Sequence, residues 1–100
     1  MTEALPIHVD PQQVAELCRR HGIVRLAVFG SALSRAFTES SDVDVLVEFA
    51  PGRTPGFAFF AIQDELTQLF ARRVDLQTPA FLSAHFREQV RAQARVLFAA

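Results

Sequence analysis

The sequence has no lysine, tyrosine or tryptophan, and Cys18 is its single cysteine. Without lysine, both Schiff-base catalysis and the lysine-bearing phosphate loop are excluded. Without tyrosine, a reaction that consumes a tyrosine hydroxyl has to take that hydroxyl from another molecule. One cysteine cannot form an intrachain disulfide, and this composition is typical of a reducing compartment.

Long apolar runs and an excess of charge are also missing. No apolar segment reaches the roughly 18–20 residues that cross a membrane, and residues 1–6 do not have the pattern of a secretory signal. Ten arginines against eleven acidic side chains give a formal net charge of −1, which excludes a general electrostatic attraction to nucleic acid. We expect a single cytoplasmic domain over residues 1–100, with no membrane contact and no direct nucleic-acid partner.

Helical and strand patterns alternate along the chain. Asp10 followed by Pro11 is typical of a helix start, and Gly22 can end that helix in the left-handed conformation. Apolar periodicity predicts the remaining elements. We expect helices at 11–21, 32–37, 59–70 and after Ser83, and strands at 23–29, 42–49 and 73–77; residues 96–98 form either a last strand or a helix end. This order predicts an α/β (α+β) fold with a mixed sheet of three or four strands.

Asp42 and Asp44 stand at the start of an otherwise apolar strand. Side chains two residues apart on a strand share one face, with Cβ atoms roughly 6–7 Å apart. At an effective dielectric constant of about 20, two such charges repel each other by roughly 2–3 kcal/mol. A divalent cation would offset this repulsion, and paired carboxylates suit Mg²⁺ or Mn²⁺. The alternative is a frayed strand start at which both carboxylates are solvated.

Gly30 and Ser31 end the preceding strand, and ten residues separate Ser31 from Asp42. If the two strands are neighbours, these residues lie near one end of the sheet. Glycine allows a phosphate to approach the backbone closely, and the helix that Ser31 opens offers free N–H groups to an anion. An anion site beside paired carboxylates is what a metal–triphosphate complex requires. An ordinary strand-to-helix turn is the alternative.

With these motifs the sequence resembles a known family. The segment FGSALSRAFTESSDVDVLVEF (29–49) is similar to the signature of the nucleotidyltransferase superfamily related to DNA polymerase beta. The segments RTPGFAFFAIQDEL and RRVDLQTP extend the resemblance over nearly the whole chain. The short length resembles that of the minimal nucleotidyltransferases (MNT), whose bacterial members are antitoxins encoded beside HEPN-domain proteins. The resemblance implies a nucleotidyltransferase-like sheet with helices packed mainly on one face.

The family has a third carboxylate on a later strand, and Asp75 is the residue that matches it. The apolar neighbours of Asp75 point to the core by alternation, so Asp75 faces the side that carries Asp42 and Asp44. The alternative is a carboxylate at the strand edge that pairs with Arg72 or Arg73.

The resemblance implies a magnesium-dependent transfer of AMP from ATP. Asp42, Asp44 and Asp75 would be the catalytic residues and would hold two Mg²⁺ ions, while Gly30 and Ser31 would bind the outer phosphates. In the family the acceptor is a tyrosine of the HEPN toxin. We therefore expect a protein adenylyltransferase that acts as the antitoxin of a cognate HEPN-domain partner.

One position departs from the family pattern. Many relatives carry an arginine three residues after the serine, where this sequence has Ser34, with Arg35 directly after it. A shift of one residue along a helix turns a side chain by about 100°. Arg35 either reaches the triphosphate as a nucleotide-binding residue or remains a surface charge. The departure leaves open a second function, a non-catalytic antitoxin that neutralises its partner by forming a complex.

Two further features have simpler interpretations. Cys18 lies on the apolar stripe of the first helix, so we expect a small core residue rather than a reactive thiol. Phe57, Phe59 and Phe60 cannot all lie on one helix face, so at least one of them is a candidate for an exposed contact with a partner.

Overall fold

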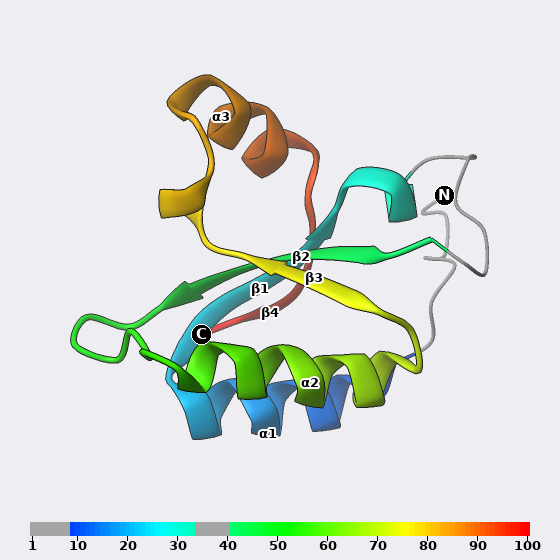
Figure 1. Ribbon diagram of the computed structural model, residues 1–100, viewed down its shortest axis with the longest axis vertical. Coiled ribbons are helices and arrows are strands. Elements are labelled where there is room, and N and C mark those ends of the chain that lie inside the picture. Colours follow the sequence, from blue (N-terminus) through cyan, green and yellow to red (C-terminus); the bar gives the residue numbers. More distant parts are fainter. Residues whose placement is uncertain (1–8, 34–40) are drawn as a thin grey trace.

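The computed structural model describes residues 9–33 and 41–100, and nine elements follow one another in these ranges (Figure 1). They are α1 (Pro11–His21), β1 (Ile23–Phe29), the 3₁₀ turn η1 (Gly30–Leu33), β2 (Val43–Phe49), α2 (Ala58–Phe70), β3 (Val74–Gln77), the 3₁₀ turn η2 (Pro79–Phe81), α3 (Ala84–Gln93) and β4 (Arg95–Ala99). The strands expected at 23–29, 42–49 and 73–77 and the helices expected at 11–21, at 59–70 and after Ser83 are confirmed to within one or two residues.

The ends of α1 and α3 are set by the residues that the sequence indicated. The Asp10 carboxylate accepts a hydrogen bond of 2.9 Å from the backbone N–H of Gln12, and Gly22 ends α1 with φ of 70°. At the start of α3, the Ser83 hydroxyl accepts a hydrogen bond of 3.3 Å from the N–H of Phe86. These caps satisfy N–H groups that have no partner inside their helices.

Residues 95–99 form a strand and not a helix end. The chain becomes extended at Ala94, and β4 then pairs with β1 in antiparallel register. This pairing provides hydrogen-bond partners for the backbone groups along one edge of β1. Because these partners are distant in sequence, the local pattern of residues 95–99 does not predict the strand. The helix expected at 32–37 is described only in part, since Gly30–Leu33 form η1 and residues 34–37 lie outside the described ranges.

The four strands form one mixed sheet in the order β3-β2-β1-β4. β1 is antiparallel to both β2 and β4, while β2 and β3 are parallel and are joined through α2. A parallel pair needs such a crossover connection, because the chain has to return to the same end of the sheet. The expected mixed sheet is thus confirmed.

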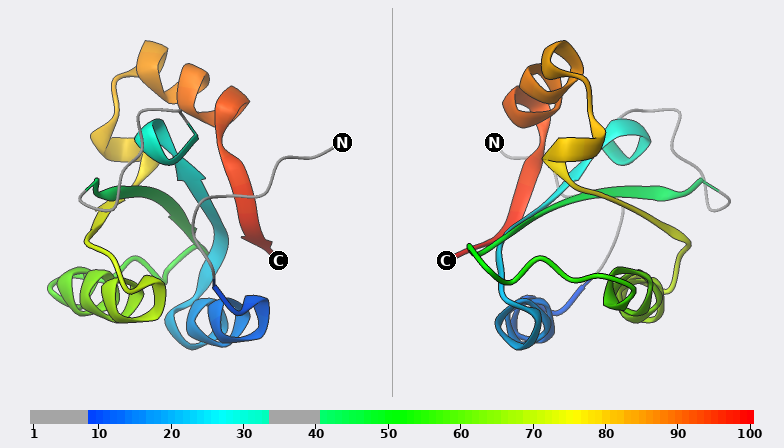
Figure 2. Two further views of the ribbon diagram at one scale, coloured as in Figure 1. Left: turned by 90° about the vertical axis from the view of Figure 1, so that its right-hand side faces the viewer. Right: turned by 60° about the vertical axis from the view of Figure 1, so that its left-hand side comes forward.

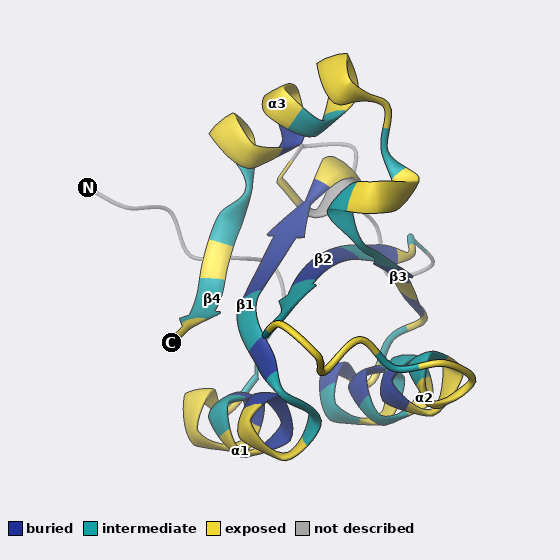
Figure 3. Ribbon diagram, turned by 90° about the vertical axis from the view of Figure 1, so that its left-hand side faces the viewer, coloured by how far each residue is buried: buried dark blue, intermediate teal, exposed yellow. Residues whose placement is uncertain are grey.

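Helices cover both faces of the sheet, two on one face and one on the other (Figure 2). α1 and α2 lie side by side and pack on the face formed by alternate apolar residues of the strands. α3 lies across the opposite face, where Val90 contacts a smaller cluster with Phe29 and Leu46. Figure 3 shows the dark blue, buried strand residues between these layers and the largely exposed outer side of α3. The expectation that helices pack mainly on one face is confirmed.

Alternation along the strands explains the two clusters. Val43, Val45 and Val47 of β2 join the larger core under α1 and α2, whereas Leu46 between them faces α3. Ile62 and Leu66 of α2 pack into the larger core and have no exposed surface. Because successive side chains of a strand point to opposite faces, the apolar residues of β2 belong to two separate layers.

Cys18 belongs to the same larger core, as the sequence indicated. Its side chain is fully buried on α1, and burial raises the pKa of the thiol to about 12. A thiol with such a pKa carries almost no thiolate at neutral pH, so Cys18 is a packing residue. No helix within the described part of the chain has the length and apolar character that crossing a membrane requires.

We predict that Leu66→Ala lowers the free energy of unfolding by about 3 kcal/mol, because it leaves a cavity in the larger core. Urea denaturation followed by far-UV circular dichroism measures this loss. Gln68→Ala, an exposed position on the same helix, is the control and should change the free energy by less than about 0.5 kcal/mol. Equal losses in both variants would contradict this assignment of the core.

Candidate active site

Strand pairing brings the residues of three separate segments to one end of the sheet. Phe29, the last residue of β1, lies opposite Asp44 in the antiparallel pair. Asp44 in turn lies beside Asp75 in the parallel pair of β2 and β3. Gly30 directly follows Phe29, so Gly30, Asp44 and Asp75 come together although they are distant in sequence.

The backbone of Gly30 lies directly against the carboxylate of Asp44. Gly30 has φ of 70°, a conformation that other residues rarely adopt. A Cβ atom built on Gly30 would overlap Oδ2 of Asp44 and would lie 3.2 Å from its Cγ. Glycine is therefore required here for two independent reasons, the backbone conformation and the space that the carboxylate occupies.

A cavity of about 330 Å³ lies between this end of the sheet and α3. Gly30, Asp44 and Asp75 line it from the sheet, together with Phe29 and Gln77. The wall opposite them is made by residues of α3 and the segment before it: Leu82, Phe86, Gln89, Val90 and Gln93. The cavity thus combines two carboxylates, an apolar wall and several amide groups, and its size is that of a small-ligand site.

Sequence reasoning did not identify the residues that α3 contributes. Phe86, Gln89 and Gln93 line the cavity because α3 lies across the second face of the sheet. Their spacing of three and four residues places them on one side of the helix. That spacing was the available signal, but glutamines on a helix are usually solvated and do not by themselves indicate a site.

Asp42 lies at the rim of this arrangement and not among the residues that line the cavity. Its Oδ1 atom is 3.1 Å from Nε of Arg73, and 49% of its side chain is exposed. Asp75 accepts a hydrogen bond of 3.0 Å from the side chain of Gln77. Arg73, one of the two arginines that the sequence offers as alternative partners of Asp75, thus pairs with Asp42.

The remaining predicted residues are Ser31 and Arg35. Ser31 belongs to η1, but its side chain is not described, and Arg35 lies outside the described residues. Of the helix expected at 32–37, residues 32 and 33 are described, and they belong to the 3₁₀ turn η1 that begins at Gly30. The turn begins at Gly30, beside Asp44, so the backbone of this segment enters the site.

The donor atoms of the site fit a magnesium ion that binds together with a nucleotide. Among the described residues, no three histidine, cysteine, aspartate or glutamate side chains are grouped closely enough to hold a metal ion. Mg²⁺ is usually bound through one or two carboxylates, with water and substrate phosphates as the other ligands. Asp44 and Asp75 supply two such carboxylates in one cavity, next to the glycine at which a phosphate could approach.

The model of the nucleotidyltransferase domain family matches residues 11–98 of the chain. The chain therefore belongs to the nucleotidyltransferase domain family, as the resemblance of the sequence predicted. The match includes β1, β2 and β3 with the residues that line the cavity from the sheet.

Individual relatives agree with this assignment. The chain is 39% identical over 61 residues to MJ0128 of Methanocaldococcus jannaschii, a candidate protein adenylyltransferase, and the match covers 60% of each protein. It is similar to the structure of a candidate minimal nucleotidyltransferase, with a TM-score of 0.71, 39% identity, and coverage of 84% of this chain and 85% of that one. The MNT antitoxin complex with a tri-AMPylated HEPN toxin from Shewanella oneidensis shares the fold, with a TM-score of 0.64, 21% identity, and coverage of 90% of this chain and 70% of the matched chain.

We predict that Gly30→Ala destabilises the protein more than Gly52→Ala. Both glycines have positive φ, but a Cβ at Gly52 meets nothing within 4 Å, whereas one at Gly30 meets Asp44. Gly52→Ala should lower the free energy of unfolding by roughly 1 kcal/mol through strain of the backbone alone. Gly30→Ala should lower it by at least about 1 kcal/mol more.

Urea denaturation of both variants measures this difference. Adding Asp44→Ala to Gly30→Ala should remove the additional loss of stability relative to Gly52→Ala, because the carboxylate that blocks the Cβ is then absent. Equal losses of stability in Gly30→Ala and Gly52→Ala would contradict the close contact between Gly30 and Asp44.

Proposed function

We propose that this protein is a magnesium-dependent nucleotidyltransferase that transfers AMP from ATP to a partner protein. The observation that carries the proposal is the cavity in which Gly30, Asp44 and Asp75 meet from three segments of the chain. Membership of the nucleotidyltransferase domain family supports the reaction class. The similarity to MJ0128 and to a complex with an AMPylated toxin supports AMP as the transferred group.

In the proposed reaction, Asp44 and Asp75 would hold magnesium, and Asp42 would join them from the rim of the cavity. Bound Mg²⁺ supplies stabilisation of the negative charge that develops on the phosphate oxygens. An acceptor hydroxyl attacks the α-phosphorus of ATP, the bond to the bridging oxygen breaks, and pyrophosphate leaves. The carboxylate of Asp75 accepts the proton of the attacking hydroxyl.

The nucleotide is expected to enter with its phosphates toward Gly30. The absence of a Cβ there leaves the backbone open to a phosphate oxygen. We assign Ser31 to the same phosphates on the basis of the family pattern, and Arg35 as the arginine that stands one residue after the position where many relatives carry one. On the opposite wall, Phe86 and the glutamines of α3 offer an aromatic ring and amide groups to the rest of the nucleotide.

We further propose that the acceptor is a tyrosine of a cognate HEPN-type toxin, for which this protein is the antitoxin. The chain contains no tyrosine, so it cannot modify itself on that side chain. In the related complex from Shewanella oneidensis, the HEPN toxin is tri-AMPylated and is bound to an MNT antitoxin.

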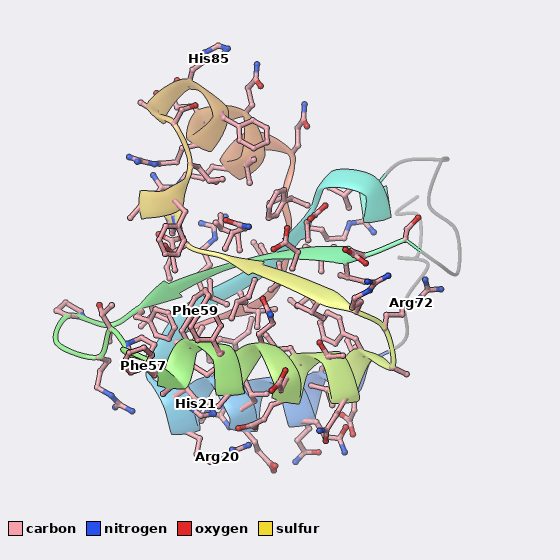
Figure 4. All side chains as sticks on the ribbon, in the orientation of Figure 1. Arg20, His21, Phe57, Phe59, Arg72 and His85 are labelled. Atoms are coloured by element: carbon pink, nitrogen blue, oxygen red, sulfur yellow. The ribbon has the colours of Figure 1, made fainter. Side chains whose placement is uncertain are left out.

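Exposed aromatic side chains support a protein as the partner. Phe57, Phe60 and Phe81 are 92%, 61% and 69% exposed, and they border a groove of about 410 Å³ beside the start of α2. Phe59 at the base of this groove packs against the core and makes edge-to-face contacts with Phe60 and Phe81, at centroid distances of 6.0 and 6.1 Å. In Figure 4, Phe57 lies at the edge of the molecule before α2, and Phe59 lies between α2 and the sheet.

We predict that the purified protein, mixed with its partner, Mg²⁺ and ATP, adds AMP to the partner. Intact-mass spectrometry should show one or more added AMP groups, and none when EDTA removes the metal. Asp44→Asn and Asp75→Asn should each slow the addition by roughly 100-fold or more, because each removes a negative charge from the proposed metal site. Asp64→Asn, an exposed position on α2, is the matched control and should have no effect.

The same experiment tests the alternative function. A stable complex with the partner and no gain of mass under any metal condition would contradict the transfer and support a non-catalytic antitoxin. Loss of AMP addition in all variants, the Asp64 control included, would indicate general damage and would require comparison of their folding by circular dichroism.

We predict that the double variant Phe57→Ser and Phe60→Ser binds the partner at least about tenfold more weakly, because exposed aromatic anchors often dominate protein interfaces. Its affinity for ATP should stay unchanged, since neither side chain lines the cavity at Asp44, and its stability should fall by no more than the loss of the edge-to-face contact between Phe59 and Phe60, about 1 kcal/mol. Isothermal titration calorimetry measures both affinities. Unchanged affinity for the partner would exclude this groove as a contact surface.

A further inference from the structure

Arg73 occupies a special position beside the three predicted catalytic carboxylates. The N–H of Val43 donates a hydrogen bond of 2.8 Å to the backbone carbonyl of Arg73, which extends the parallel pairing of β2 and β3 by one residue. Asp42 and Arg73 are thus neighbours across the two strands, two residues before Asp44 and Asp75 and on the same face of the sheet. Asp42, Asp44 and Asp75 place three negative charges at this end of the strands, and Arg73 adds a positive charge beside them.

The contact between Arg73 and Asp42 is close but open to solvent. Nε of Arg73 lies 3.1 Å from Oδ1 of Asp42, with 79% of the arginine side chain and 49% of the aspartate side chain exposed. Ion pairs this exposed stabilise proteins only weakly, so another ligand can replace either partner at little cost. The same pair nevertheless occupies an oxygen of Asp42 and places a cation next to the proposed metal site.

We propose that Arg73 is an exchangeable counter-ion, which pairs with Asp42 before the nucleotide binds and pairs with a phosphate group afterwards. This inference rests on the proposed function. A guanidinium group binds phosphate oxygens in a forked, bidentate geometry, which makes phosphate a better partner than a single carboxylate oxygen. Loss of the contact with Arg73 then makes the Oδ1 atom of Asp42 available to magnesium.

The exchange couples the metal ion to the nucleotide. A divalent cation that enters alone meets the positive charge of Arg73 and an Asp42 oxygen already in use, so it binds weakly. A cation that enters with ATP meets neither obstacle, because the triphosphate has drawn Arg73 away. The two ligands therefore bind with positive cooperativity, in which each strengthens the binding of the other.

The test uses Arg73→Gln with Mn²⁺ as the metal probe and the non-hydrolysable analogue AMP-PNP as the nucleotide. We expect the affinity for Mn²⁺ alone to rise roughly three- to tenfold, because a competing cation has been removed. We expect the affinity for AMP-PNP in the presence of Mn²⁺ to fall roughly tenfold, because a charged hydrogen bond to phosphate has been lost. Isothermal titration calorimetry measures both, and neither depends on turnover.

Arg20→Gln is the matched control. Arg20 also forms an exposed ion pair, at 3.0 Å from Glu65, but it lies at the end of α1 (Figure 4), and no residue of α1 lines the cavity. Arg20→Gln removes the same charge and should change neither the affinity for Mn²⁺ nor the affinity for AMP-PNP. Arg73→Lys keeps the charge without the forked geometry, so its affinity for Mn²⁺ should match the original protein while its affinity for AMP-PNP should still fall.

The outcomes separate this inference from the function on which it rests. If the original protein does not bind AMP-PNP with Mn²⁺, the proposed function and the exchange both fail. If it binds, but Arg73→Gln weakens both ligands, Arg73 merely orients Asp42 and the exchange is wrong. Unchanged affinities in folded Arg73→Gln, checked by thermal unfolding, would equally overturn it.

Discussion

The register between the parallel strands β2 and β3 is the constraint on which the site depends. Val43 pairs with Val74 and Asp44 pairs with Asp75, so apolar residues face α1 and α2 while carboxylates face α3. A slip of one residue would turn Asp75 into the core and expose Val74, which is only 4% exposed here. Core packing therefore fixes the positions of the carboxylates, and the site needs no separate device to assemble it.

The cost of this arrangement is electrostatic. Neighbouring carboxylates repel each other, and burial of unpaired charge is expensive. The structure limits the cost by leaving Asp42 and Asp75 exposed and by setting polar groups beside them: Arg73 contacts Asp42 and Gln77 contacts Asp75. Asp44 alone is half-buried, and it is held against the glycine backbone where a larger residue would not fit.

Local patterns predicted most of the fold, because caps and periodicity act over a few residues. Asp10, Gly22 and Ser83 each contact groups within four residues, and β2 shows its two faces directly in its alternation. Long-range pairing was harder to predict. The strand at 95–99 depends on an edge of β1 some seventy residues away in sequence, and the residues that α3 adds to the cavity depend on the face against which that helix packs.

The path of the chain after β3 connects the two surfaces that the proposed function requires. Asp75 and Gln77 line the cavity, and Thr78, Ala80 and Phe81 line the aromatic groove directly after them. An extended chain advances about 3.3 Å per residue, so roughly 10 Å of backbone separates Asp75 from the groove. The groove that would receive a partner and the carboxylate that would accept a proton are therefore joined by one short segment of the chain.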